Sequence, residues 1–413
     1  MNHFAWLALG AYLLTVAFTY FLKFKNLNHL KKHGTEIPAG FEEQIDAELL
    51  KKTMAYTIEY SQFGFVTSIF SNILILIFIF GGILDAYNSW VISWHWSFIF
   101  TGIVFFLLLS YVHTFLSIPF DLYATFHIEN KYGFNTQTPR LWVADFFKSI
   151  VLSTILFVIV GGGVFGLIQI SPKWWWLFVW GFIFIFSIFM NYISPYVIEP
   201  LFNKYEPVKI EGLEEKIKAL LKKAGIKVSR VFQMDASKRS KYVNAYFGGI
   251  GKTKRIVLYD TLLEKMNQDE ILAVLAHEAG HWKKKHVLKS LVALELFSLI
   301  SIFIAFQILQ SDWIYEIFGI TAPNLLVGFI LISFIGGILS FPFSPITSYL
   351  SRRREYQADR LAAEFMGGAQ YLITALIKLS KDNLSNLHPH PWYAAFYYSH
   401  PPVVERINHL RKL

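Results

Sequence analysis

The chain of 413 residues contains no cysteine, so it can form no disulfide and can offer no thiolate to a metal ion. Any metal site must therefore be built from histidine and carboxylate side chains. Charged residues are also scarce at 16% of the sequence, whereas a soluble domain has about a quarter. With 54% hydrophobic residues and a mean hydropathy of +0.42, the chain is too apolar to be soluble and is expected to lie in a membrane.

Seven apolar runs are long enough to cross a bilayer, which takes about 20 apolar residues in a helix. These runs are Phe4–Leu22, Phe63–Leu84, Phe98–Ile118, Ile150–Ile170, Trp174–Tyr196, Val287–Leu309 and Leu325–Tyr349. The first run lacks a basic start and a small-residue cleavage site, so it is interpreted as an uncleaved span. An odd number of spans predicts that the two termini lie on opposite sides of the membrane.

Lysine and arginine are concentrated in alternate loops. Residues 23–62, 119–149 and 197–286 and the C-terminal tail contain lysine or arginine, whereas residues 87–97 and 310–323 contain neither. The positive-inside rule therefore predicts that the N-terminus is outside and that the 197–286 segment and the C-terminus are cytosolic. The net charge of +9 is explained by loops that contact anionic lipid, so no nucleic-acid partner is expected.

The 197–286 segment contains the motif His277-Glu278-Ala279-Gly280-His281, an HExxH, on a predicted helix. Histidines four residues apart lie on one face of a helix, so both imidazoles can reach one zinc ion. Glu278 is then placed to act as a general base toward water. Asn267 and Glu270 predict a capping box at the start of this helix.

A catalytic zinc ion needs a third protein ligand. His286 lies about 140° round the helix from His281, so we expect it to point elsewhere. The best candidate is Glu355, which follows the seventh span on the same predicted side as the HExxH motif. The alternative for Glu355 is an ion pair with the neighbouring Arg352–Arg354 run.

Asp359 lies one helical turn after Glu355 and is expected to accept the second N–H of a ligating histidine. The alternative is a surface ion pair with Arg360 or Lys378. Elsewhere in the segment, Leu213–Lys223 has the pattern of an amphipathic helix that ends at Gly225.

Three short stretches of the same segment are predicted to be strands. They are Val231–Met234, Arg255–Tyr259 and an edge strand over Asn244–Phe247, which is followed by a turn at Gly248-Gly249.

These residues resemble the type I CAAX prenyl proteases, which are integral-membrane zinc metalloproteases, and the resemblance covers nearly the whole chain. The stretches that carry it are the HExxH motif with Trp282 and His286, Arg354–Asp359, Tyr397–Arg406, Thr125–Asn135 and Asn244–Tyr246. The resemblance implies a mainly α membrane protein, with seven transmembrane helices around a chamber and a cytosolic α+β zinc metalloprotease domain.

The resemblance also implies roles for individual residues. His277, His281 and Glu355 are expected to bind one Zn²⁺ ion. His400 and Arg406 are expected to stabilise the oxyanion or grip the substrate.

Asn244 is expected to bind the substrate backbone. The substrates of the family are C-terminal CAAX sequences with a prenylated cysteine, from which the last three residues are removed. The predicted function is a membrane-embedded zinc endopeptidase that removes C-terminal residues from prenylated CAAX proteins or peptides. The expected partners are a prenylated or membrane-associated peptide substrate and the lipid bilayer.

The predicted organisation has four parts: spans 1–5 in residues 1–196, a catalytic insertion in 197–286, spans 6–7 in 287–349 and a C-terminal catalytic segment in 350–413. The chain is shorter than expected of a eukaryotic member and lacks cysteine. A bacterial inner membrane is therefore favoured over the endoplasmic reticulum membrane.

Three other functions are considered. A membrane quality-control zinc protease would use the same chemistry on misfolded or unlipidated substrates. A chaperone or channel with a vestigial zinc site would not need Glu278. An intramembrane protease of the site-2 kind would place Lys283, Lys284 and Lys285 near the bilayer centre, where charge is costly.

Overall fold

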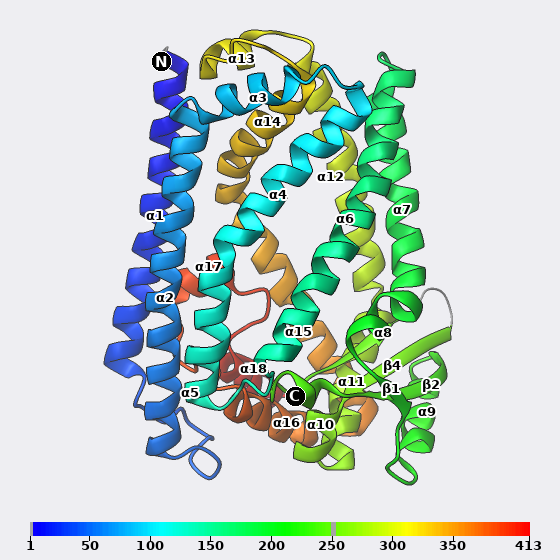
Figure 1. Ribbon diagram of the computed structural model, residues 1–413. Helices are drawn as coiled ribbons and strands as arrows, with labels where there is room; N and C mark the ends of the chain where they lie inside the picture. Colours follow the sequence, from blue (N-terminus) through cyan, green and yellow to red (C-terminus); the bar gives the residue numbers. More distant parts are fainter. Residues whose placement is uncertain (1–2, 249–252) are drawn as a thin grey trace.

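Seven helices of the computed structural model, which describes residues 3–248 and 253–413, are long and apolar enough to cross a membrane, as predicted. They stand upright above a smaller domain, and the two chain ends lie at opposite ends of the molecule (Figure 1). The spanning helices are α1 (His3–His33), α2 (Ala47–Phe80), α4 (Phe98–Tyr123), α6 (Pro139–Ile170), α7 (Trp175–Val197), α12 (His286–Leu309) and a seventh helical segment, Leu325–Met366, that begins with α14 (Leu325–Ser340).

Several of these helices extend beyond the predicted apolar runs, because hydropathy measures the lipid-facing length and polar turns can continue a helix outside it. Local side chains set some of the starts. The Asp46 carboxylate accepts a hydrogen bond from the Leu49 N–H at 2.8 Å before α2, and the Thr138 hydroxyl accepts one from the Leu141 N–H at 3.2 Å before α6.

The last predicted run, 325–349, is not one continuous α-helix. α14 ends at Ser340, a 3₁₀ turn η3 covers Phe341–Phe343, and α15 (Ser344–Met366) continues out of the apolar region. Pro342 and Pro345 lack the backbone N–H that an unbroken helix would need there. The break changes the direction of the chain just before the segment that carries Glu355.

The spanning helices bury little of themselves against one another. The most apolar 18-residue windows of α2 and α7 are only 6% buried and that of α12 is 0% buried. The buried core lies instead at the two ends: one cluster gathers around the short helices α3 (Ile83–Ile92) and α13 (Trp313–Phe318), and another fills the smaller domain. Low burial between the ends supports helices arranged around an open interior and not a solid bundle.

The smaller domain contains a four-stranded sheet with the order β1-β2-β4-β3. β2 and β4 are parallel, and the outer strands β1 and β3 are antiparallel to their neighbours. The strands are β1 (Tyr205–Pro207), β2 (Lys227–Met234), β3 (Ala245–Gly248) and β4 (Thr253–Tyr259). The three predicted strands are therefore confirmed, with β3 at an edge, while the predicted turn at Gly248-Gly249 lies partly outside the described residues.

Helices cover one face of the sheet and complete the domain. The predicted helix over Leu213–Lys223 is confirmed as α9, and Gly225 after it has a φ of +76°, which a glycine adopts readily. The other elements are the π-turn η1 (Ala124–Glu129), α5 (Asn130–Tyr132), α8 (Glu199–Phe202), η2 (Ala236–Lys238), α10 (Asp260–Lys265), α11 (Gln268–Lys283), α16 (Gln370–Asp382), α17 (Pro391–Tyr397) and α18 (Val403–Leu410).

Candidate metal centre

The start of α11 is fixed by the predicted capping box. The Asn267 side chain accepts a hydrogen bond from the Glu270 N–H, and the Glu270 carboxylate accepts one from the Asn267 N–H, each at 2.9 Å. The buried Glu270 also pairs with Lys378 of α16 at 2.7 Å. The HExxH helix is therefore anchored at its first turn to a second helix of the domain.

A close contact between α11 and α15 brings the two halves of the site together. Gly280 lies so near α15 that an added Cβ would be 3.0 Å from both the Cα and the carbonyl oxygen of Ala358. Only a glycine facing a small residue allows two helices to approach this closely. This approach places Glu355 and Asp359 of α15 opposite the HExxH residues.

Three side chains form a compact donor set. The Nε2 atoms of His277 and His281 are 3.2 Å apart, and the Glu355 carboxylate oxygens lie 3.3 Å from the first and 3.2 Å from the second. Glu355 Oε2 is buried and has no hydrogen-bond partner. A tetrahedral ion such as zinc, bound at about 2.0–2.1 Å, holds its ligand atoms about 3.3 Å apart, so these residues fit a metal ion.

The outer nitrogen of His277 is held by a buried acid. Asp359 Oδ1 lies 2.8 Å from His277 Nδ1, and Asp359 is 0% exposed. Arg406 of α18 donates to both carboxylate oxygens of Asp359, at 2.9 and 2.5 Å, and its Nη1 is 3.7 Å from Glu355 Oε2. Burial lowers the pKa of Arg406, but the bonds to Asp359 and the negative charges of Asp359, Glu355 and Glu278 together outweigh it, so the pKa is raised and the guanidinium stays charged.

The surface ion pairs considered as alternatives for Glu355 and Asp359 are not formed between the described residues. Arg352 instead donates to the carbonyl oxygens of Ala394 and Tyr398, and Lys378 pairs with Glu270. Both carboxylates therefore belong to the histidine cluster.

His286 lies outside the donor set of the described residues, as predicted, but the reasoning behind that prediction was wrong. It assumed an unbroken helix, but Lys285 adopts a left-handed conformation with a φ of +56°, which separates α11 from α12. His286 turns back, so that its Nδ1 lies 3.1 Å from His281 Nδ1, and its Nε2 is 3.0 Å from Oε1 of the Gln357 side chain. Sequence reasoning thus missed His286 and Gln357, although the three lysines before His286 were a signal that a helix ends there.

Glu278 lies on α11 between the two histidines in sequence. It is half-buried, and no hydrogen bond to its carboxylate is formed by the described residues, although its negative charge helps to raise the pKa of Arg406. His400 lies in the loop between α17 and α18, with its Nε2 3.5 Å from Glu355 Oε1 and its side chain 65% exposed. His400 is therefore exposed beside the donor set, whereas Glu278 is half-buried on the helix that carries both histidines.

Asn244 is exposed and directly precedes the edge strand β3. Its side-chain oxygen accepts a hydrogen bond from the Ala245 N–H at 2.8 Å, and its carbonyl oxygen accepts one from the Tyr259 N–H at 3.2 Å. It therefore fixes the point at which the edge of the sheet begins.

A multi-pass membrane protein in which an HExxH helix and a distant glutamate form one donor set is a membrane metallopeptidase. Comparison with family models divides the chain into two parts. Residues 26–204 match the CAAX prenyl protease N-terminal model, described as five membrane helices, and residues 207–413 match peptidase family M48.

The alignments with individual relatives cover nearly the whole chain. The CAAX prenyl protease 1 homolog of Arabidopsis thaliana is 33% identical over 96% of this chain and 95% of its own length. The Homo sapiens homolog is 31% identical over 92% and 90% of the two chains. The crystal structure of S. mikatae Ste24p superposes with a TM-score of 0.91 at 29% identity, covering 99% of both chains.

The chain belongs to the CAAX prenyl protease 1 family, within peptidase family M48. The resemblance found in the sequence and the predicted fold class are therefore confirmed: the protein is a multi-pass membrane metalloprotease with a metal centre. The expected bacterial origin gains no support, since the relatives named here come from eukaryotes.

Proposed function

We propose that this protein is a zinc endopeptidase that removes C-terminal residues from prenylated CAAX peptides. The observation that carries the proposal is the donor set of His277, His281 and Glu355, with the half-buried Glu278 directly after His277 on the same helix. The relatives bear the name CAAX prenyl protease, which supports this class of substrate.

The three donor residues would hold one Zn²⁺ ion, which supplies Lewis acidity toward the scissile carbonyl group and lowers the pKa of water. Glu278 removes a proton from the attacking water and then delivers it to the leaving amine. Asp359 orients His277, and His286 orients His281, through the outer ring nitrogens. These contacts keep both inner nitrogens facing Glu355.

His400 and Arg406 have different surroundings, which favour different roles. The exposed His400 is placed to donate a hydrogen bond to the developing oxyanion, an interaction worth about 3–4 kcal/mol in other enzymes. Arg406 is buried against Asp359 and Glu355, so we assign it to balancing their charge and holding Asp359 in place. A direct contact of Arg406 with substrate stays a prediction.

The substrate backbone would lie along β3, because an edge strand offers unpaired backbone groups to an extended peptide. Asn244 at the start of β3 would then set where the peptide begins to pair. The catalytic parts of the chain are residues 197–286 and 350–413, and the membrane parts are residues 1–196 and 287–349.

We also propose that the metal centre faces the cytosol and that the N-terminus is outside. The basic loops favour this orientation by the positive-inside rule. Modification of a single cysteine introduced near either end of a spanning helix, in sealed vesicles, tests it.

A farnesylated CAAX peptide and its unlipidated twin test the substrate. The wild type should cleave the farnesylated peptide and leave the twin nearly intact. Equal cleavage of both would favour a quality-control protease instead.

Glu278→Gln should keep the metal content of the wild type but lose about 10²–10⁴-fold in turnover. Retained turnover in this variant would refute the general-base role.

Metal analysis tests the ion. One zinc per chain is expected in the purified protein, and a different metal or a different count would overturn that part of the proposal. A protein that keeps one zinc but cleaves no peptide would point to a non-catalytic membrane protein.

A further inference from the structure

A cleft of about 730 Å³ opens where the chain leaves the spanning helix α7 and enters the sheet. It is lined by the end of α7, by the α8 segment and by one face of β1, β2 and β4, away from the metal ligands. Its volume is in the range of small-molecule sites, which is about 300–1,000 Å³. Tyr192 and Tyr196 near the end of α7 are 61% and 66% exposed, which is typical of residues at a membrane interface.

Two arginines meet on the floor of this cleft. Arg230 of β2 and Arg255 of β4 are partners in the parallel register of the two strands, and both line the cleft. Like charges directly opposite each other destabilise a sheet unless something compensates them. No ion pair between described residues includes either arginine, and none includes Lys204 at the rim.

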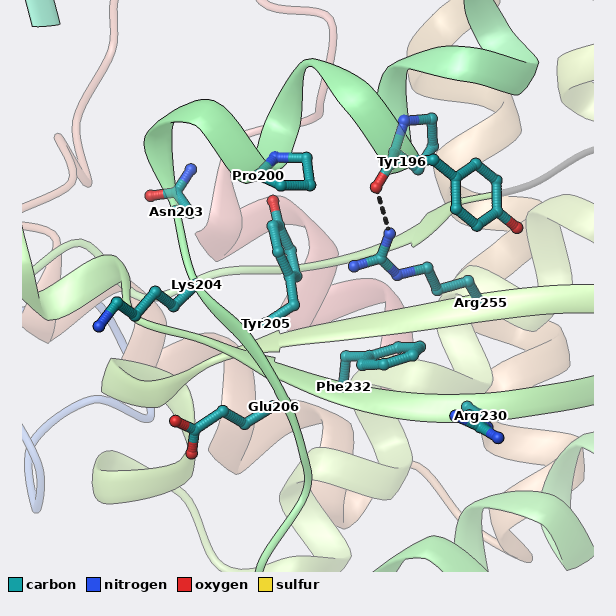
Figure 2. A pocket seen from close by; sticks show the side chains of 10 residues that line it. Tyr196, Pro200, Asn203, Lys204, Tyr205, Glu206, Arg230, Phe232 and Arg255 are labelled. Carbon is teal, nitrogen blue, oxygen red and sulfur yellow. Dashed lines mark hydrogen bonds between the residues drawn. The ribbon is translucent and has the colours of Figure 1, made fainter.

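The Arg255 side chain is fixed in place, but not all of its hydrogen-bond donors are used. Its guanidinium lies 4.4 Å from the Tyr205 ring and 4.5 Å from the Phe232 ring, and Nη1 donates to the Pro195 carbonyl oxygen at 2.7 Å. Figure 2 shows the guanidinium between these two rings and the end of α7. Its Nε is buried and has no hydrogen-bond partner. Nη2 is not buried and forms no hydrogen bond to the described residues. An arginine fixed in this way, with Nη2 still able to donate, is suited to a planar or tetrahedral oxyanion.

Glu206 is the acidic residue among those that line the cleft. Its carboxylate is already bonded to Lys209 at 2.6 Å. It therefore leaves the positive charge of Arg230, Arg255 and Lys204 largely uncompensated.

We propose that this cleft binds a phosphate group, carried by the headgroup of an anionic phospholipid in the leaflet next to the smaller domain. A lipid headgroup and free inorganic phosphate share this chemistry. The position of the cleft at the end of a spanning helix favours the lipid, because a headgroup lies at that depth. Tyr205 and Phe232 would then pack beside the phosphate while the arginines bond its oxygens.

The test uses the full-length protein, purified in detergent and stripped of lipid. Thermal unfolding is followed with added phosphatidylglycerol, with phosphatidylcholine and with inorganic phosphate, and lipid retained by the protein is measured by mass spectrometry. We expect phosphatidylglycerol alone to be retained and to raise the unfolding midpoint. Protection by inorganic phosphate at the same concentration would support a phosphate site but would show that its ligand need not be a lipid.

Two variants test whether the arginines of the cleft hold the lipid. Arg255→Gln should weaken retention of phosphatidylglycerol about tenfold, the effect of losing one charge-assisted hydrogen bond. Arg230→Gln should weaken it to a similar degree, and because Arg230 is exposed this variant is expected to fold normally. Lys222→Gln on the exposed surface of α9 is the matched control for loss of one charge and should retain phosphatidylglycerol as the wild type does.

An equal loss of lipid in all three variants would show general electrostatic attraction and would overturn the site. Unchanged retention in both arginine variants would overturn it as well. Arg255→Lys keeps the charge but not the planar donors, so partial retention is expected.

Discussion

Helices α11 and α15 pack more closely at the metal centre than the spanning helices do midway along their length. At the metal centre, Gly280 faces the Ala358 backbone with no space for a methyl group. In the spanning part, Gly336 and Gly337 of α14 have no atom within 4 Å of an added Cβ. Gly102, Gly163 and Gly328, at the opposite end of the spanning helices, are crowded by neighbouring side chains as well. The comparison teaches that close packing is concentrated at the metal centre and at that opposite end, while the spanning helices leave space between the two.

The largest expected effect comes from removing a donor at the tightly packed site. Glu355→Ala should abolish both metal binding and peptide cleavage, because two histidines alone leave the ion without a third protein ligand. Asn191→Ala, at an exposed position of the spanning helix α7, is the control and should keep the metal content of the wild type. Metal analysis and peptide cleavage check both variants, and a Glu355→Ala protein with full zinc would contradict the assignment.

Two glycine variants test the difference in packing directly. Gly280→Ala should lower the free energy of unfolding by about 1–3 kcal/mol, because the Ala358 backbone cannot move aside as a flexible side chain would. Gly337→Ala should leave stability unchanged or raise it slightly, because a helix favours alanine and there is space for it. Unfolding midpoints in one detergent compare the two, and equal shifts would remove the contrast.

His286 and Gln357 act on the metal only through His281. Gln357→Ala should weaken metal affinity about 10–100-fold by freeing His286 from its outer partner. Competition with a chelator gives the affinity. If the variant reaches the wild-type kcat once excess zinc saturates the metal site, Gln357 is a positioning residue. A kcat that stays low would point to a catalytic role for Gln357.

The smallest effect is expected at the helix starts. Asn267→Ala removes the capping box of α11 and should cost about 1 kcal/mol of stability together with some metal affinity. Thr138→Ala removes the corresponding side-chain cap of α6 and should leave metal affinity unchanged. Equal metal affinity in both variants would show that the first turn of α11 does not affect the site.

Local spacing was enough to predict some parts of this molecule. The pair of His277 and His281, the capping box and the seven spans follow from periodicity within one segment. The prediction of Glu355 as a ligand needed one further assumption, that it lies on the same side of the membrane as the HExxH motif.

The remaining parts depend on geometry that spacing does not contain. The position of His286 follows from the left-handed backbone at Lys285, which helical periodicity could not reveal. The bonds of Arg406 to Asp359 join residues 47 positions apart, and the arginine pair of the cleft depends on the parallel register of β2 and β4. Such contacts arise only when separate elements are folded together.

The two residues that join α11 to α12, and the short turn that joins α14 to α15, have a practical meaning for protein engineering. One half of the donor set is attached to the sixth span and the other half to the seventh, with no linker long enough to cut. A water-soluble catalytic fragment therefore cannot be excised from this chain, and inhibitor screening must use the intact polypeptide in detergent or lipid.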